Sequence, residues 1–232
     1  DIVTLDMLPE DRIRKKLMFE PNQVDRFHMA VERDYGHQYM RNMLQLNNGQ
    51  NGFSEIGRLA GIHRTDWSWA PLLADFDNDG YLDIYITNGF GKDVTDLDFV
   101  KFRSDAASLF SNKEEMETRV YEGFKKQPSI TIPNYVFRNE KDLTFSDQSG
   151  NWGIAYPSIS NGVAYADLDG DGDLEIIVSN IDREAFVFKN NFVEQNPASN
   201  FLRISLKGSV RTNWRPASTC VANSRRGAFG GC

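Results

Sequence analysis

The sequence has little cysteine and little histidine. Cys220 and Cys232 are the only cysteines and both lie near the end of the chain, so disulfide bonds cannot staple its main body. His28, His37 and His63 are the only histidines, and none stands at a ligand-like spacing from Cys, Asp or Glu. We therefore assign the histidines structural or surface roles, and we expect a fold that holds without disulfides.

Long apolar runs and long basic runs are also missing. No stretch of about 18 apolar residues occurs, so the sequence predicts no membrane-spanning helix. The net charge of −7 and the lack of a basic stretch argue against nucleic acid as a partner. The chain begins at Asp1 with neither an initiator Met nor a charged-then-apolar signal segment, and we expect a mature, processed or excised piece.

Catalytic motifs are scarce. The sequence has no P-loop and no dinucleotide fingerprint, and residues 52–57 have one residue too many for a nucleophile elbow. Pairs of carboxylates leave a glycosidase open, although the acids best suited to it belong to the loops described below. Trp67, Trp69 and Trp152 could form a platform for carbohydrate, but we favour a packing role. We expect a protein that is not an enzyme.

What the chain does contain is an internal repeat. At an offset of 92 residues, as from Asn47 to Asn139, identical residues recur without a gap. The complete units cover about 42–88 and 134–180. Shared residues include Phe53 and Phe145, Gly61 and Gly153, Ser68 and Ser160, Asp75 and Asp167, Gly80 and Gly172, and Asn88 and Asn180.

Each unit has the pattern of about four short strands, as in the blade of a β-propeller. Residues 1–6 resemble 83–88, and residues 186–190 resemble 135–139, so we expect a fragment of a larger array. The predicted fold class is all-β, with propeller-like blades over residues 1–208. A helical insertion is expected at about 97–127, with Phe99, Phe102 and Phe110 at helical spacing, and an irregular tail at 209–232.

An acidic loop of the form Asp-x-Asp-x-Asp-Gly follows the third strand of each unit, so the chain has two such loops. Calcium takes 6–8 oxygen ligands in flexible geometry, and alternating side chains on a tightly curved loop can converge on it. The glycine at position 6 permits the positive φ of the sharp turn. Position 7 would offer a backbone carbonyl, and we expect the Asp173 carboxylate to face outward. The candidate ligands are Asp75, Asp77, Asp79, Tyr81 and Asp83 in one loop and Asp167, Asp169, Asp171, Asp173 and Glu175 in the other.

Three other interpretations of these loops are weaker. Solvated turns would leave several like charges close together without a cation. An EF-hand needs a Glu at position 12 and flanking helices, whereas Ile86 and Val178 stand there between predicted strands. Magnesium prefers few carboxylates and retained waters. Calcium is therefore the predicted ion.

The acidic loop followed by a strand and Asn resembles the FG-GAP/VCBS repeat of integrin α-subunit propellers. Residues 6–10, 39–42, 67–70 and 200–202 further resemble secreted bacterial proteins of the ASPIC/UnbV type, relatives of cartilage acidic protein. The resemblance covers about 1–208, and residues 210–232 depart from it. It implies a calcium-stabilised propeller that is secreted or lies on the cell surface.

The sequence thus predicts a calcium-binding, non-catalytic extracytoplasmic module for protein or glycan binding or adhesion. Its further partners would be the remaining blades of a longer protein. The alternative is an enzyme, or an enzyme-associated domain, that acts on polysaccharide and holds calcium for structure alone. A scaffold without its own ligand is a third possibility.

Overall fold

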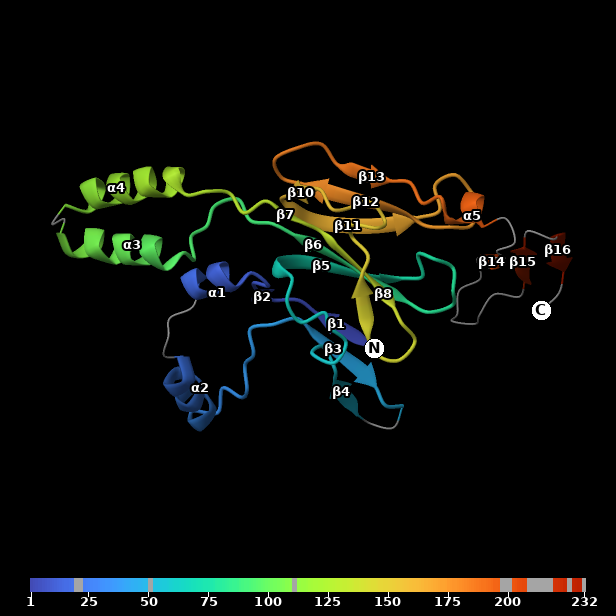
Figure 1. The fold of residues 1–232 in the computed structure, drawn as a ribbon, viewed down its shortest axis with the longest axis horizontal. Helices are drawn as coiled ribbons and strands as arrows, with labels where there is room; N and C mark the ends of the chain where they lie inside the picture. Colours follow the sequence, from blue (N-terminus) through green and yellow to red (C-terminus); the bar gives the residue numbers. More distant parts are fainter. Residues whose placement is uncertain are drawn as a thin grey trace, which may run out of the picture.

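The computed structural model describes residues 1–18, 23–49, 52–109 and 112–196, together with the backbone of three strands at 202–207, 219–224 and 227–230. Strands make up most of the ordered secondary structure, and the helices lie outside the sheets (Figure 1). Among the described residues, no helix has the length and apolar character needed to cross a membrane.

The two repeat units fold into the same strands at the same offset. Within each unit the two strands that flank the acidic loop pair in the same register, since Ala74 lies opposite Asp83 and Ala166 lies opposite Glu175. The corresponding strands are β3 (Met43–Asn47) and β8 (Tyr135–Asn139), β4 (Phe53–Glu55) and β9 (Phe145–Asp147), β5 (Asp66–Ala74) and the pair β10 (Pro157–Ser158) with β11 (Ser160–Ala166), and β6 (Asp83–Asn88) and β12 (Glu175–Asn180).

These strands form three antiparallel, blade-like sheets. The second blade is complete, with the order β5-β6-β8-β9, and β2 (Met7–Leu8) extends it beyond β5. The first blade is β1 (Ile2–Thr4), β3 and β4, and the third is β11, β12 and β13 (Phe186–Phe188). Among the described strands, the first blade has no counterpart of β5 and the third has none of β9. The predicted all-β, propeller-like fold is confirmed.

The apolar core lies between neighbouring blades. Alternate residues of β6 serve the two sides, because successive strand residues point to opposite faces. Ile84 and Ile86 pack toward the first blade, and Tyr85 packs toward the third. One cluster holds Leu44, Ala60, Ile62, Ile84, Ile86 and Phe137, and the other holds Ala74, Phe76, Tyr85, Val136, Ile154, Ile176 and Val178.

The segment expected to be a helical insertion contains two helices, α3 (Leu97–Leu109) and α4 (Lys113–Lys126). They form a hairpin that projects from one end of the molecule (Figure 1). A Cβ atom at Gly123 would collide with the Phe102 ring, so glycine permits the close contact between the helices. Phe110 lies outside the described residues. Two further helices, α1 (Arg12–Met18) and α2 (Gln23–Glu32), precede β3.

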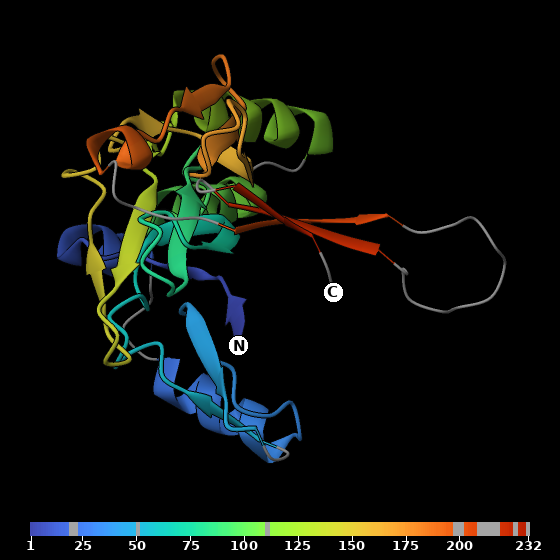
Figure 2. The ribbon, with the colours of Figure 1, turned by 90° about the vertical axis from the view of Figure 1, so that its right-hand side faces the viewer.

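Beyond the third blade, the short helix α5 (Phe192–Gln195) is followed by a separate antiparallel sheet. It consists of β14 (Leu202–Lys207), β15 (Thr219–Ser224) and β16 (Gly227–Gly230), and Figure 2 shows it extending away from the blades. The prediction of an irregular tail at 209–232 was therefore wrong for residues 219–224 and 227–230. Strand β15 pairs with β14, and β16 pairs with β15. The local sequence pattern does not reveal this pairing.

A buried ion network joins α1 to the second blade. Arg14 donates from Nε to Asp66 Oδ2 at 2.7 Å and from Nη1 to Asp93 Oδ2 at 2.5 Å. The side chains of Arg14, Asp66 and Asp93 are only 17%, 8% and 9% exposed. Removing one partner of such a group leaves uncompensated charge in a poorly solvated place.

We expect Arg14→Ala to lower the free energy of unfolding by about 3 kcal/mol, because it leaves two buried carboxylates without their cation. Urea denaturation measures this loss. The control is Lys113→Ala, which removes an exposed pair with Glu117 and is expected to change stability by no more than about 0.5 kcal/mol. Equal effects of the two substitutions would contradict this account of the network.

Candidate metal centre

The first acidic loop, residues 75–83, connects β5 to β6. One carboxylate oxygen from each of Asp75, Asp77 and Asp83 lies within 4.8 Å of the others. Left-handed backbone at Asn78 (φ 51°) and Gly80 (φ 88°) provides the tight curvature that brings them together. Positions 1, 3 and 9 of this loop therefore converge as the sequence pattern predicts.

Asp83 holds the loop against its own blade. It is 1% exposed, and its two oxygens accept hydrogen bonds from the backbone N–H groups of Phe76 (3.1 Å) and Asn139 (2.9 Å). Burial, together with the charges of Asp77 and Asp75, raises the pKa of Asp83 to about 6 despite these two bonds.

Asp75 closes the turn itself. Its carboxylate accepts from the N–H groups of Asp79 (3.0 Å) and Gly80 (2.8 Å). Burial raises the pKa of Asp75, and the charges of Asp77 and Asp79 act in the same direction. The folded loop thus gathers carboxylates at some cost in charge repulsion.

The second loop, residues 167–175, repeats this arrangement between β11 and β12. Oxygens of Asp167, Asp169 and Glu175 lie within 4.8 Å of one another, at the same positions 1, 3 and 9. Glu175 Oε2 accepts the N–H of Leu168 at 2.7 Å, as Asp83 accepts that of Phe76. A further group of three, Asp169, Asp171 and Glu194, adds an acid from α5 that the sequence analysis did not include.

Each loop also meets a basic side chain at the end of the strand that pairs next in its blade, Arg138 in β8 and Lys189 directly after β13. Arg138 Nε lies 2.6 Å from Asp77 Oδ2, and at the equivalent place Lys189 Nζ lies 3.0 Å from Asp169 Oδ2. Lys141 pairs with Asp79 at 3.1 Å. Asp79 does not join the converging set. Burial tends to raise the pKa of Asp79, but Lys141 and Arg138 hold it below its ordinary value. No loop-internal pattern indicated these cations.

Three carboxylate oxygens in the loops are buried without a hydrogen-bond partner: Asp77 Oδ1, Asp173 Oδ1 and Glu175 Oε1. Those of Asp77 and Glu175 belong to the converging sets, and they favour a bound cation over the basic side chains alone. A buried carboxylate oxygen without a partner is costly, and an ion would satisfy it. Hard oxygen donors at positions 1, 3 and 9 suit calcium, so the residues present fit the ion that the sequence predicts.

The expected orientation of Asp173 was wrong. Its carboxylate does not face outward, because residue 173 is fully buried and its Oδ2 accepts the N–H of Val193 in α5 at 2.9 Å. Burial raises the pKa of Asp173, and the charges of Asp171 and Glu175 add to this. The chain after β13 folds back over the loop, which the loop sequence could not show. Tyr81 at the same position of the first loop is 47% exposed, with Lys141 over its ring.

One comparison with known proteins matches both repeat units. The family model of the FG-GAP-like repeat matches residues 33–86 and 129–178, which overlap the two repeat units and include both acidic loops. The comparison with curated proteins gave no match. Two segments of the chain thus match the FG-GAP-like repeat, and this agrees with the propeller-type blades.

We expect the Asp83 carboxyl to titrate near pH 6 in calcium-free buffer, well above its ordinary pKa of 3.8. Because the folded pKa is the higher one, the contribution of Asp83 to stability is complete below about pH 3.8 and is lost as the pH rises through about 6. Carbon-13 NMR of the side-chain carboxyl groups measures the midpoint.

Asp142 serves as the internal control for this titration. Hydrogen bonds from the side chain and the backbone N–H of Thr144 lower the pKa of Asp142, so it is expected to titrate below 3.8. A common midpoint for Asp83 and Asp142 would contradict the burial of Asp83.

Proposed function

We propose that this chain is a calcium-binding, non-catalytic extracytoplasmic module that presents its blades and loops to a protein or glycan ligand, as in adhesion. The observation that supports calcium most strongly is the repeated convergence of positions 1, 3 and 9. In each loop one of these carboxylates carries a buried oxygen without a hydrogen-bond partner, Asp77 in the first and Glu175 in the second.

Asp75, Asp77 and Asp83 would hold the ion of the first loop, and Asp167, Asp169 and Glu175 that of the second. Asp79 and Asp171 at position 5, and the backbone carbonyls of Tyr81 and Asp173 at position 7, complete the proposed ligand sets. A bound calcium ion would supply positive charge that offsets the repulsion among the carboxylates. Calcium would compete with Arg138 and Lys189 for the carboxylates at position 3.

The number of acids favours the second loop as the stronger site. Residues 167–175 include five acidic side chains, and Glu194 approaches from α5. Residues 75–83 include four acidic side chains. Basic side chains offset part of the attraction for a cation at both loops, because Lys189 pairs with Asp169 and Glu194, and Arg138 and Lys141 pair with Asp79.

Calcium sites of modest affinity would suit an environment in which calcium is abundant. Extracellular modules bind calcium at about 10⁻⁴–10⁻³ M, far above the level inside a cell. The resemblance to secreted proteins supports the same location. We therefore propose a location outside the cytoplasm, with further blades of a longer protein as neighbours.

Calcium is expected to raise the melting temperature. Ligand that binds the native state at 100 times its dissociation constant adds about 2.7 kcal/mol per site. Differential scanning calorimetry in calcium and in EDTA measures this, with magnesium at equal ionic strength as the control. Identical melting curves in calcium and EDTA would refute the proposed metal sites.

We expect Asp169→Asn to abolish measurable calcium binding at the second loop and to leave the first loop intact, because it removes the charge at position 3. Isothermal titration should then show one binding site where the native chain shows two. Asp77→Asn is expected to do the reverse, and Asp182→Asn, which alters an exposed acid outside both loops, should change nothing. Equal titrations for all three variants would show that the ligand positions are wrong.

Glycan arrays probed with and without calcium address the ligand. Calcium-dependent retention of glycan without cleavage would support a binding module. Cleavage of a polysaccharide would instead favour the enzymatic alternative.

A further inference from the structure

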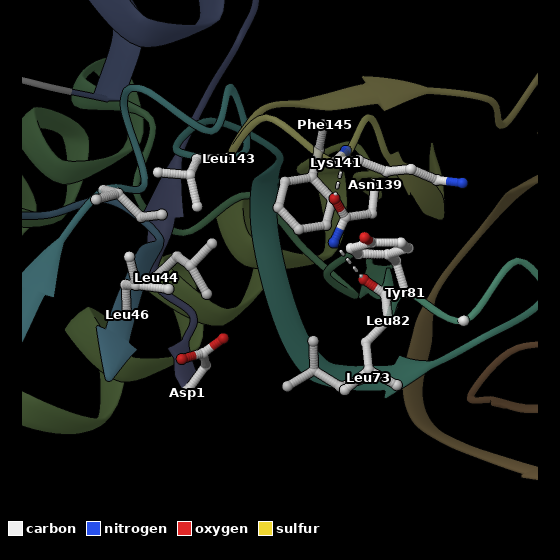
Figure 3. A pocket seen from close by; sticks show the side chains of 12 residues that line it. Asp1, Leu44, Leu46, Leu73, Tyr81, Leu82, Asn139, Lys141, Leu143 and Phe145 are labelled. Carbon is white, nitrogen blue, oxygen red and sulfur yellow. Dashed lines mark hydrogen bonds between the residues drawn. The ribbon is translucent and has the colours of Figure 1, made fainter. Parts of the chain in front are cut away.

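A cleft opens between the first and second blades, next to the first acidic loop (Figure 3). Its volume is about 350 Å³. Leu82 and Leu143 stand beside it with 53% and 46% of their surface exposed. We call it the blade cleft, and its lining includes Leu44, Leu46, Leu73, Leu82, Leu143 and Phe145.

The same place between the second and third blades is filled. Phe76, which follows β5 at position 2 of the first loop, is 4% exposed and belongs to the apolar cluster shared with the third blade. Asn190 Nδ2 donates to the Phe76 carbonyl at 2.7 Å. Asn78 Nδ2 donates to the Gly172 carbonyl at 3.2 Å. The loop that follows β5 thus closes the gap between the second and third blades, and we call β5 the inner strand of its blade.

The residues that receive Phe76 and Asn78 have counterparts in the blade cleft. Asn190 ends the segment equivalent to β8 and therefore corresponds to Asn139, and Gly172 corresponds to Gly80 at the repeat offset. Both Asn139 and Gly80 line the cleft. Asn139 Nδ2 donates to the Leu82 carbonyl, just as Asn190 approaches the Leu174 carbonyl. Asn139 and Gly80 thus line the cleft at the positions where Asn190 and Gly172 contact the loop after β5. The segment that would contact them is a counterpart of β5 and its loop.

That counterpart is the strand that the first blade lacks among the described residues. In the second blade, β6 pairs with β5 on one side and β8 on the other. The equivalent strand β1 pairs with β3, and no described strand pairs with its other edge. An exposed strand edge beside an apolar cleft is the arrangement that accepts an added strand.

We propose that the blade cleft and the free edge of β1 receive the inner strand and acidic loop of a further FG-GAP-like repeat. The incoming strand pairs with β1, the large apolar side chain at position 2 of its loop fills the cleft, and the carbonyl of that residue accepts from Asn139. This inference rests on the repeated blade geometry and not on calcium.

Backbone strain at the cleft supports an apolar role for its rim. Leu143 has a φ of 71°, in the left-handed region that a leucine rarely adopts. Strained residues of this kind are often kept for a function. An exposed leucine in that conformation gives the cleft apolar surface at a position where the fold alone would favour Gly or Asn.

The test uses a fluorescein-labelled peptide with the sequence of residues 69–81, which carries the end of β5 and the start of the first loop. Fluorescence anisotropy with the full chain should show saturable binding in both EDTA and calcium. A peptide with Phe76→Ala should bind about tenfold more weakly, because it no longer fills the cleft. Absence of saturable binding, or equal binding of the two peptides, would overturn the proposal.

Variants of the protein locate the binding. Leu82→Gln and Leu143→Asn should each weaken peptide binding by about fivefold or more, since both remove apolar surface from the rim. Asn tolerates a positive φ, so Leu143→Asn should not lower the melting temperature. Ile181→Gln, at a residue that is 65% exposed and outside the cleft, is the matched control and should bind as the native chain does. Binding that is unchanged in both rim variants would place the peptide elsewhere and refute the proposal.

Discussion

The carboxylate at position 9 of the acidic loop links each loop to the strands around it. Asp83 accepts hydrogen bonds from the N–H of Phe76, at position 2 of its own loop, and from the N–H of Asn139, at the end of β8. Asp1, at the equivalent position of the first blade, accepts the N–H of Asn47, and Glu175 accepts that of Leu168. These backbone groups would otherwise lack partners at the end of a hairpin, so the loop conformation depends on an acid at this position.

This requirement for an acid at position 9 brings several carboxylates close together in a poorly solvated place. Burial of the acids at positions 1 and 9 raises the pKa of Asp75 and of Asp83, and repulsion from the neighbouring carboxylates adds to this effect. Arg138 and Lys189 offset part of this charge from equivalent places in two blades. They leave Asp77 Oδ1 and Glu175 Oε1 without partners, and these oxygens are the reason to infer a cation in addition to the side chains.

The sequence predicted the features that recur in both repeat units. The offset of 92 residues located the strands of both units, because β3, β4 and β6 recur as β8, β9 and β12 with shifted numbers. It also predicted the convergence of positions 1, 3 and 9. The same pattern named Asp79, which the structure turns toward Lys141.

The repeat pattern could not predict contacts between segments that lie far apart in the sequence. The burial of Asp173 depends on α5, and the pairing of β15 depends on β14. Glu194 and Arg138 approach the loops from elements far along the chain, so their part in the site could not be read from the loop sequences. The blade cleft is likewise visible only when one inter-blade contact is compared with the next.

The most direct test of calcium in these loops is anomalous X-ray diffraction from crystals grown in calcium. The account predicts two anomalous peaks, each about 2.3–2.6 Å from carboxylate oxygens. One should lie among Asp75, Asp77 and Asp83, and the other among Asp167, Asp169 and Glu175. Loops without such peaks, with Arg138 and Lys189 still paired to Asp77 and Asp169, would show that side-chain cations alone balance the acids and would contradict the account.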